Sequence, residues 1–160
     1  MSTLCNGEVS LVYVALRPID DTNKDACVAL SLTEAQTKLI APNSESLAWA
    51  DTNPQCVPLG IYADGEMVGF AMYEPRGNDV FSVHRFMIDK RHQGKGIGLR
   101  AMQLVMERIS SRGGKTIYLS FRPENVAAKR LYEKLGFDFH EEEPDGELVY
   151  FISENHVLWA

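Results

Sequence analysis

The spacing of apolar and polar residues changes several times along the chain, and each change predicts a different element. Residues 11–16 are a short apolar, partly β-branched run that predicts a first strand. Residues 20–30 and 32–40 carry apolar side chains at helical spacing, and a further helix-like piece covers residues 45–51. The chain therefore begins with one predicted strand and two or three short helices.

Beyond these helices, apolar residues recur at every second position, the period of a half-buried strand. The run 57–62 is separated from the run 67–73 by Asp64-Gly65, a strong hairpin signal. A turn at residues 76–79 leads into a third run, 80–88. These three strands are predicted to form an antiparallel meander.

The apolar phase changes within the run 80–88. Phe81 and Val83 occupy odd positions, whereas Phe86 and Ile88 occupy even ones. One interpretation is a β-bulge, an extra residue near His84 or Arg85. The other is a strand end that is buried on both faces, and the sequence leaves both open.

The second half of the chain predicts two helices and three strands. A helical pattern after the glycines at 94–98 stops at Gly113-Gly114, and the β-rich run 116–121 predicts a strand parallel to the run 80–88. A helix from Pro123-Glu124 to Gly136 and strands at 137–140 and 148–153 complete the pattern.

A glycine-rich segment, Gln93-Gly94-Lys95-Gly96-Ile97-Gly98, lies between a predicted strand and a predicted helix. Glycines let the backbone approach a ligand closely, and the first amides of a helix are unpaired donors with positive partial charge. The segment therefore predicts a cradle for pyrophosphate. It is not a Walker loop, because Gly94-Lys95 is followed by glycine, and its spacing differs from the dinucleotide fingerprint.

Length and composition limit the possible functions. With 160 residues and 45% apolar side chains, the chain suits one domain over residues 1–160. The net charge of −6 disfavours nucleic acid and favours a basic small molecule. No bilayer-spanning run or signal peptide is evident, which predicts a cytoplasmic protein that binds no membrane. Cys5, Cys27 and Cys56 lack disulfide or zinc spacing, so reduced thiols and no metal are expected.

Two motifs resemble those of the GNAT superfamily of N-acetyltransferases. The spacing Gln93-x-x-Gly96-x-Gly98 is similar to the family's acetyl-coenzyme A (acetyl-CoA) loop. The stretch Asn125-x-x-Ala128-x-x-Leu131-Tyr132-Glu133-Lys134-Leu135-Gly136-Phe137 is close to its second characteristic pattern. The resemblance covers nearly the whole chain. It implies an α/β (α+β) GNAT fold with a single mixed central sheet of about seven strands, flanked by helices and splayed between the fourth and fifth strands.

The resemblance also implies where acetyl-CoA binds. Main-chain groups at the end of the run 80–88 are expected to form hydrogen bonds with the pantetheine arm. Amides of the glycine-rich segment are expected to bind the pyrophosphate. Lys95 or Arg100 would add charge, unless Lys95 is a solvated loop lysine. The expected cofactor-binding residues are Phe86, Met87, Ile88, Gln93, Gly94, Lys95, Gly96, Ile97, Gly98, Leu99, Arg100, Asn125, Ala128 and Tyr132.

Acetyl transfer to an amine requires a neutral nucleophile, a polarised carbonyl and a proton for the departing thiolate. The resemblance assigns that proton to Tyr132, whose phenol is protonated at neutral pH; the alternative is a core tyrosine. A backbone N–H near Ile88 is the expected donor to the carbonyl. Glu74 and His84 are the candidate bases, although each also fits a structural role and water is another proton carrier.

Stretches around Gly60, Val68 and Arg85 are further similar to bacterial diamine, spermidine and spermine acetyltransferases, where an acidic residue often stands at the position of His84. The expected activity is acetyl-CoA-dependent N-acetylation of a small primary amine, with polyamines favoured. Alternatives are a protein or peptide amine, an aminoglycoside-type drug, or a non-catalytic acyl-CoA sensor. The acidic run 141–147 fits a solvated hairpin or a polycation site. Residues 157–159 suit a homodimer contact or packing within the subunit.

Overall fold

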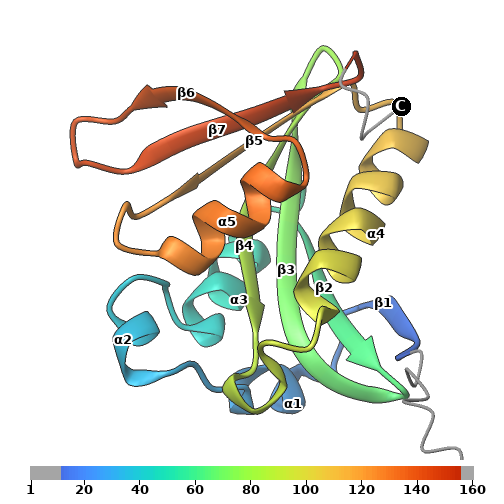
Figure 1. Cartoon of the computed structure of the whole chain (residues 1–160). Coiled ribbons are helices and arrows are strands. Elements are labelled where there is room, and N and C mark those ends of the chain that lie inside the picture. The colour runs from blue at the N-terminus through green and yellow to red at the C-terminus, as the bar shows by residue number, and fades with distance from the viewer. Residues whose placement is uncertain (1–11, 156–160) are drawn as a thin grey trace, which may run out of the picture.

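The computed structural model describes residues 12–155, which form one seven-stranded sheet with helices on both faces (Figure 1). The strand order is β1-β2-β3-β4-β5-β7-β6. Only β4 and β5 are parallel, and the other neighbouring pairs are antiparallel, which confirms the predicted meander and parallel unit. The strands are β1 Val14–Pro18, β2 Val57–Ala63, β3 Glu66–Gly77, β4 Val80–Ile88, β5 Thr116–Phe121, β6 Asp138–Glu142 and β7 Leu148–Ser153.

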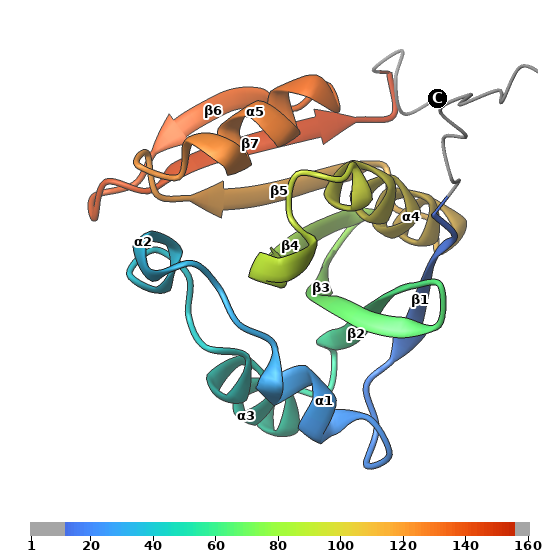
Figure 2. The same cartoon turned by 60° about the horizontal axis from the view of Figure 1, so that its bottom comes forward.

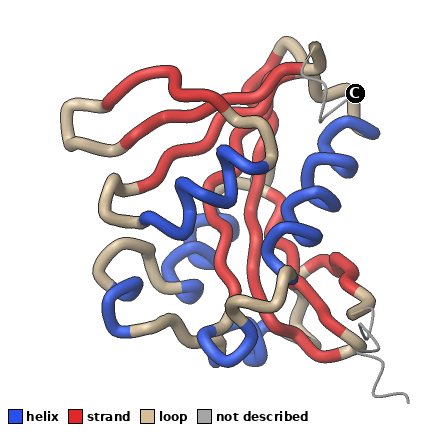
Figure 3. The backbone as a smooth tube through the Cα atoms, in the orientation of Figure 1, coloured by secondary structure: helices blue, strands red, loops and turns tan. Residues whose placement is uncertain are grey.

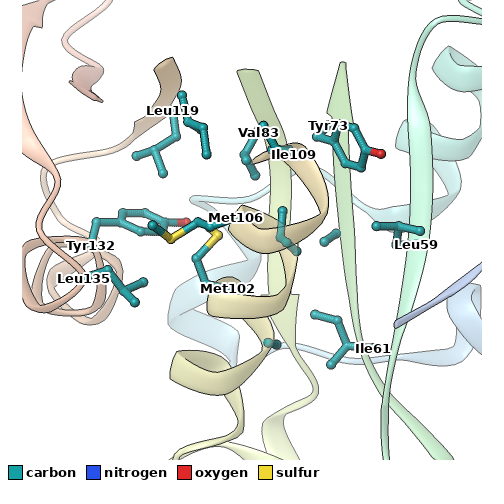
Figure 4. Close-up of a cluster of buried hydrophobic side chains, with 14 of the residues drawn as sticks. Leu59, Ile61, Tyr73, Val83, Met102, Met106, Ile109, Leu119, Tyr132 and Leu135 are labelled. Carbon is teal, nitrogen blue, oxygen red and sulfur yellow. The ribbon is translucent and has the colours of Figure 1, made fainter. Parts of the chain in front are cut away.

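Helices cover the two faces of the sheet in pairs (Figure 2). We call the side of α4 Ile97–Ser111 and α5 Val126–Lys134 the α4/α5 face, and the side of α1 Lys24–Ala29 and α3 Asn43–Thr52 the α1/α3 face. The buried stripe of α4 packs with inner side chains of the strands and of α5 to form the larger core (Figure 4). A smaller core under α1 and α3 includes Phe70, Met72 and Met87.

The sheet opens between β4 and β5. Residues 80–83 of β4 pair with residues 116–119 of β5, and no further pair joins the two described strands. β5 continues along β7 as far as Phe121. The predicted splay between the fourth and fifth strands is therefore confirmed.

The opening begins at a β-bulge. Met72 pairs with Arg85 and Tyr73 pairs with Val83, so His84 is an extra residue without a partner on β3. The bulge explains why the apolar phase of β4 changes. The end of β4 is also buried on both faces, because Met87 belongs to the smaller core. Both interpretations of the sequence pattern thus apply.

The early elements differ from their predicted bounds. The predicted helix 20–30 starts only at Lys24, because the Asp20 carboxylate accepts a bond from the Thr22 amide in a turn. The predicted helix 32–40 shrinks to α2 Glu34–Thr37, which starts at a capping box of Thr33 and Gln36. No described helix is long and apolar enough to cross a membrane.

Three strands also extend beyond their predicted ends. β1 reaches Pro18, which an edge strand tolerates because no neighbour needs its missing N–H. β3 continues past residue 73 to Gly77, and β6 continues past residue 140 to Glu142. The first strand also starts later than predicted, because residues 12 and 13 precede β1 and only Val14 begins it. Residue 11 of that predicted strand, and the tail considered for a homodimer, residues 157–159, lie outside the described residues.

The close approach of β3 and β4 generates a stability prediction. A Cβ atom on Gly69 would stand 2.5 Å from the Met87 carbonyl oxygen, which is backbone and cannot rotate away. We expect Gly69→Ala to lower the free energy of unfolding in urea by about 1–3 kcal/mol. Gly98→Ala is the control, because its nearest contact would be 3.6 Å. Equal stability of the two variants would contradict the packing described for β4.

Candidate functional site

A cavity of about 430 Å³ lies where β4 and β5 diverge, and we call it the cleft. Its walls come from β4, from α5, from the segment around α2 and from the glycine-rich segment. Most residues of the predicted site therefore meet in one cavity, although their roles stay predictions. These lining residues are His84, Phe86, Met87, Ile88, Gln93, Gly94, Gly98, Asn125, Ala128 and Tyr132.

The glycine-rich segment, residues 93–98, follows the short 3₁₀ turn η1 Lys90–His92 and leads into α4 (Figure 3). Gly94 and Gly96 have φ angles of 76° and 80°, a left-handed conformation that glycine adopts without strain. The N–H groups of residues 97–99 donate to no acceptor among the described residues. They lie at the positive end of a 15-residue helix, which is favourable for an anion.

Tyr132 lies in the wall that α5 contributes. Its ring packs between Phe121 and Phe137, at centroid distances of 5.5 and 5.8 Å, and extends toward Met106 of α4 (Figure 4). Burial raises the pKa of the Tyr132 phenol, so the hydroxyl is protonated at neutral pH. This hydroxyl donates no hydrogen bond to any described residue, and it is therefore available to a ligand in the cleft.

Asn125 has a structural role as well as a place in the cleft. Its Oδ1 accepts a hydrogen bond from the Ala128 amide at 3.2 Å, which caps the first turn of α5. The carboxamide NH₂ is the group left for the predicted cofactor contact. The second sequence motif therefore both starts α5 and orients Tyr132.

The bulge in β4 brings His84 beside Glu74 of β3, where His84 Nε2 and Glu74 Oε1 are hydrogen-bonded. Glu74 is buried; it also accepts a bond from Cys56 Sγ at 3.3 Å and pairs with Arg76 at 3.3 Å. Burial raises the pKa of Glu74, but the bonds from His84 and Cys56 and the charge of Arg76 outweigh it and lower that pKa. Glu74 is therefore an anion at neutral pH.

Cys56 completes this cluster as a protonated thiol. Burial, together with Glu74, raises the pKa of Cys56 to about 11, so the S–H group can donate to the carboxylate. Three atoms of the kind that can ligate a metal ion lie within 4.8 Å of one another here: the sulfur of Cys56, a carboxylate oxygen of Glu74 and a ring nitrogen of His84. Cysteine spacing gave no sign of this grouping, because the three residues come from separate parts of the chain.

Arg85 fixes the bulge from the α1/α3 face. Its NH1 group donates to the His84 carbonyl at 2.7 Å, and its Nε donates to Ser46 Oγ at 3.1 Å. Ser46 is buried in α3, at 1% exposure. The backbone around His84 is therefore tied to a helix as well as to β3.

Two anchors that local patterns did not reveal hold the segment after β4. Gln93 Nε2 donates to the Ile88 carbonyl at 2.9 Å and to Gln36 Oε1 at 2.8 Å. The buried Asp89 carboxylate accepts from the Ser31 amide at 2.8 Å and the Arg91 amide at 3.0 Å. These bonds connect the glycine-rich segment to residues around α2, so Gln93 already has protein partners.

Six residues of the predicted site do not line the cleft. Glu74 lies behind His84, and the Ile97 side chain is buried in the larger core. Lys95 is exposed, and Arg100 is exposed and pairs with Glu107 at 3.6 Å. Gly96 and Leu99 are the other two. The added charge from Lys95 or Arg100 stays a prediction, and the main-chain amides at the start of α4 are the groups that the structure leaves free for an anion among the described residues.

Comparison with known proteins agrees with this geometry. The model of the "Acetyltransferase (GNAT) family" matches residues 23–137. A spermine/spermidine N(1)-acetyltransferase of Bacillus subtilis (strain 168) is 32% identical over 137 residues, which cover 81% of this chain and 90% of the relative. A ribosomal protein bS18-alanine N-acetyltransferase of Salmonella typhimurium is 28% identical over 97 residues, 61% of this chain and 65% of the relative.

Solved structures share the fold. The crystal structure of spermidine N-acetyltransferase from Vibrio cholerae, in complex with CoA and spermine, matches with a TM-score of 0.75 at 14% identity, over 89% of this chain and 96% of that one. A splayed sheet, amides at the start of α4 and the tyrosine of α5 thus accompany a family match over most of the chain. The chain belongs to the GNAT acetyltransferase family and is an acyltransferase whose co-substrate is acetyl-CoA.

Proposed function

We propose that the protein acetylates a primary amine of a polyamine such as spermine or spermidine, by direct attack of the amine on the thioester. The observation that carries this proposal is the meeting of two groups at the cleft. One is a protonated Tyr132 hydroxyl that has no hydrogen-bond partner in the part of the chain that the structure describes, and the other is His84 bonded to an ionised Glu74. The 32% identity to a spermine/spermidine acetyltransferase favours polyamines.

Backbone groups position the acetyl donor in this proposal. The free N–H groups of residues 97–99 hold the diphosphate, aided by the positive end of α4. Within residues 12–155, the edge of β4 beyond His84 has no strand partner on the β5 side, so its main chain can bond the pantetheine arm. Acetyl-CoA supplies the acetyl group as a thioester.

His84 removes the proton that the attacking amine must lose. With Nε2 bonded to the Glu74 carboxylate, the neutral imidazole carries its hydrogen on Nε2 and leaves the Nδ1 lone pair free. Glu74 orients this ring and stabilises the positive charge that the ring acquires. Glu74 is thus a positioning residue, and His84 is the base.

Tyr132 protonates the departing sulfur. As the new C–N bond forms and the C–S bond breaks, the Tyr132 O–H gives its proton to the thiolate and becomes a phenolate. Solvent then accepts the proton that His84 took from the amine and returns a proton to the Tyr132 phenolate, which restores both groups. Burial keeps the phenol protonated over the pH range in which an amine is partly neutral.

A peptide N-terminus is the second candidate acceptor, because the bS18-alanine acetyltransferase is 28% identical over 97 residues. An aminoglycoside-type drug and a sensor without turnover are further alternatives. One domain over residues 1–160, a cytoplasmic location and a homodimer also stay predictions.

An amine panel tests the acceptor class. We expect the highest kcat/KM for spermine, spermidine or putrescine, and a much lower value for an alanine-started peptide and for kanamycin, measured by release of free CoA. Acetylation of the peptide or the drug without any turnover of polyamines would contradict the polyamine proposal. Absence of turnover with every amine would favour the sensor.

Tyr132→Phe tests the proton donor. We expect kcat to fall about a hundredfold, the usual scale for one general acid, while the Kd for acetyl-CoA changes less than about twofold. Tyr73→Phe is a matched control, because the Tyr73 hydroxyl is buried without a partner outside the cleft. An unchanged kcat in Tyr132→Phe would show that Tyr132 does not donate the proton to the departing sulfur.

His84→Gln and Glu74→Gln test the base. Near neutral pH we expect His84→Gln to lower kcat/KM about a hundredfold, with partial recovery at alkaline pH, where free amine is more abundant. Glu74→Gln should cost less, because an amide can still hold the His84 ring but stabilises the positive charge that the ring acquires during the reaction less than a carboxylate does. The lowered pKa of Glu74 keeps this carboxylate ionised near neutral pH, so its own protonation does not limit the rate there.

The pair of the exposed Glu66 and the half-buried His92, 3.9 Å apart, supplies the control Glu66→Gln. This variant should keep the wild-type pH profile. A wild-type profile in both Glu74→Gln and His84→Gln would assign the proton to water instead.

A further inference from the structure

A second hollow lies beside the cleft and meets it at His84, and its remaining residues have no part in the reaction described so far. Its volume is about 300 Å³, and it shares Val83, His84, Arg85 and Ser120 with the cleft. Ile117 and Leu119 of β5 belong to the larger core on the α4/α5 face, so Tyr118 and Ser120 point to the α1/α3 face. The hollow therefore opens on the α1/α3 face and meets the cleft at the bulge.

A second β-bulge shapes the outer end of this hollow. In β6, Phe139 pairs with Tyr150 and Glu141 pairs with Val149, so His140 is an extra residue. Without the extra residue, Glu141 would face the same side as Phe139; with it, Glu141 faces the opposite side. Glu141 and Glu143 both line the hollow, whereas Glu142 between them does not.

Aromatic rings form part of this surface. The centroid of Tyr118 lies 5.4 Å from that of His140 and 5.8 Å from that of Phe151, and His140 and Phe151 are 5.6 Å apart. Tyr118 and His140 line the hollow. A tyrosine ring attracts a cation that lies over its face, and nearby carboxylates add to that attraction.

The charges in the hollow are ordered along its length. At the bulge, Arg85 has no carboxylate partner among the described residues, and Arg76 is paired with Glu74. At the far end, Glu141 lies in β6 and Glu143 directly follows it. Three strand spacings, or about 14 Å, separate β6 from β4. The hollow therefore favours a molecule that is neutral at the end near the bulge in β4 and cationic at the end near β6.

We propose that this second hollow holds the part of the acceptor that is not acetylated, and that Glu141 and Glu143 bind a second, charged amine there. This inference rests on the proposed polyamine function. The charge of Arg85 at the bulge disfavours a proton on the reacting amine beside His84, since Arg76 is neutralised by Glu74, while the acidic end retains the proton on the distal amine. The hollow thus selects acceptors in which two amines are separated by a chain long enough to reach from the bulge in β4 to β6.

Steady-state kinetics with spermidine and butylamine test the inference. In E141Q/E143Q we expect KM for spermidine to rise about five- to tenfold with kcat unchanged within about twofold, because two exposed charge contacts are lost. KM for butylamine, which has no second amine, should not change. E142Q is the control for a lost surface charge, since it removes one carboxylate of the same kind from the other face of β6.

Two further readouts separate this role from a general effect. Added salt should raise KM for spermidine in the wild type and less so in E141Q/E143Q, because screening weakens the same contacts. Tyr118→Leu should raise KM for spermidine more than for butylamine. Equal KM values for spermidine in the wild type and the double variant, or equal losses for both amines, would overturn the inference. Failure of wild-type protein to acetylate spermidine would instead overturn the proposed function.

Discussion

The break in the β4–β5 ladder at His84 is the constraint on which the site depends. Up to Val83 the two strands are paired, and beyond it they separate around a cavity. A paired strand would use its backbone groups on its neighbour, whereas the free edge of β4 can offer them to a ligand. One extra residue in β4 thus both opens the sheet and aims His84 at Glu74.

The other parts of the site act by holding this break in place. Arg85 ties the bulge to Ser46 of α3, and Asp89 and Gln93 tie the end of β4 to residues around α2. These contacts are short polar bonds at buried or half-buried positions, where an unpaired group would be costly. The start of α4 is consequently fixed relative to the edge of β4, with its free amides at one end of the cleft.

The sequence predicts those parts of the site that are local. The glycine spacing of residues 93–98, the motif that ends in Tyr132 and the phase change in β4 each arise within a few neighbouring residues, and the structure has the corresponding elements. The splay followed from resemblance to a family and not from any local pattern. Bounds of the early helices were wrong because turns and caps at Asp20 and Thr33 override apolar spacing.

Contacts between distant segments could not be predicted in this way. Glu74 and His84 were separate candidate bases, and only the register of β3 and β4 makes them one pair with Cys56 behind it. The pairing of Gln36 with Gln93 spans 57 positions. The second bulge, at His140, left no apolar phase signal because every residue of β6 is exposed.

Calorimetric titration of the purified protein with acetyl-CoA, and separately with the acetyl-pantetheine fragment that lacks the diphosphate, tests the central claim most directly. Free amides at the start of α4 predict saturable binding of acetyl-CoA and affinity for the fragment that is at least about tenfold weaker, or 1.4 kcal/mol. No saturable heat with acetyl-CoA, or equal affinity for both compounds, would contradict the account.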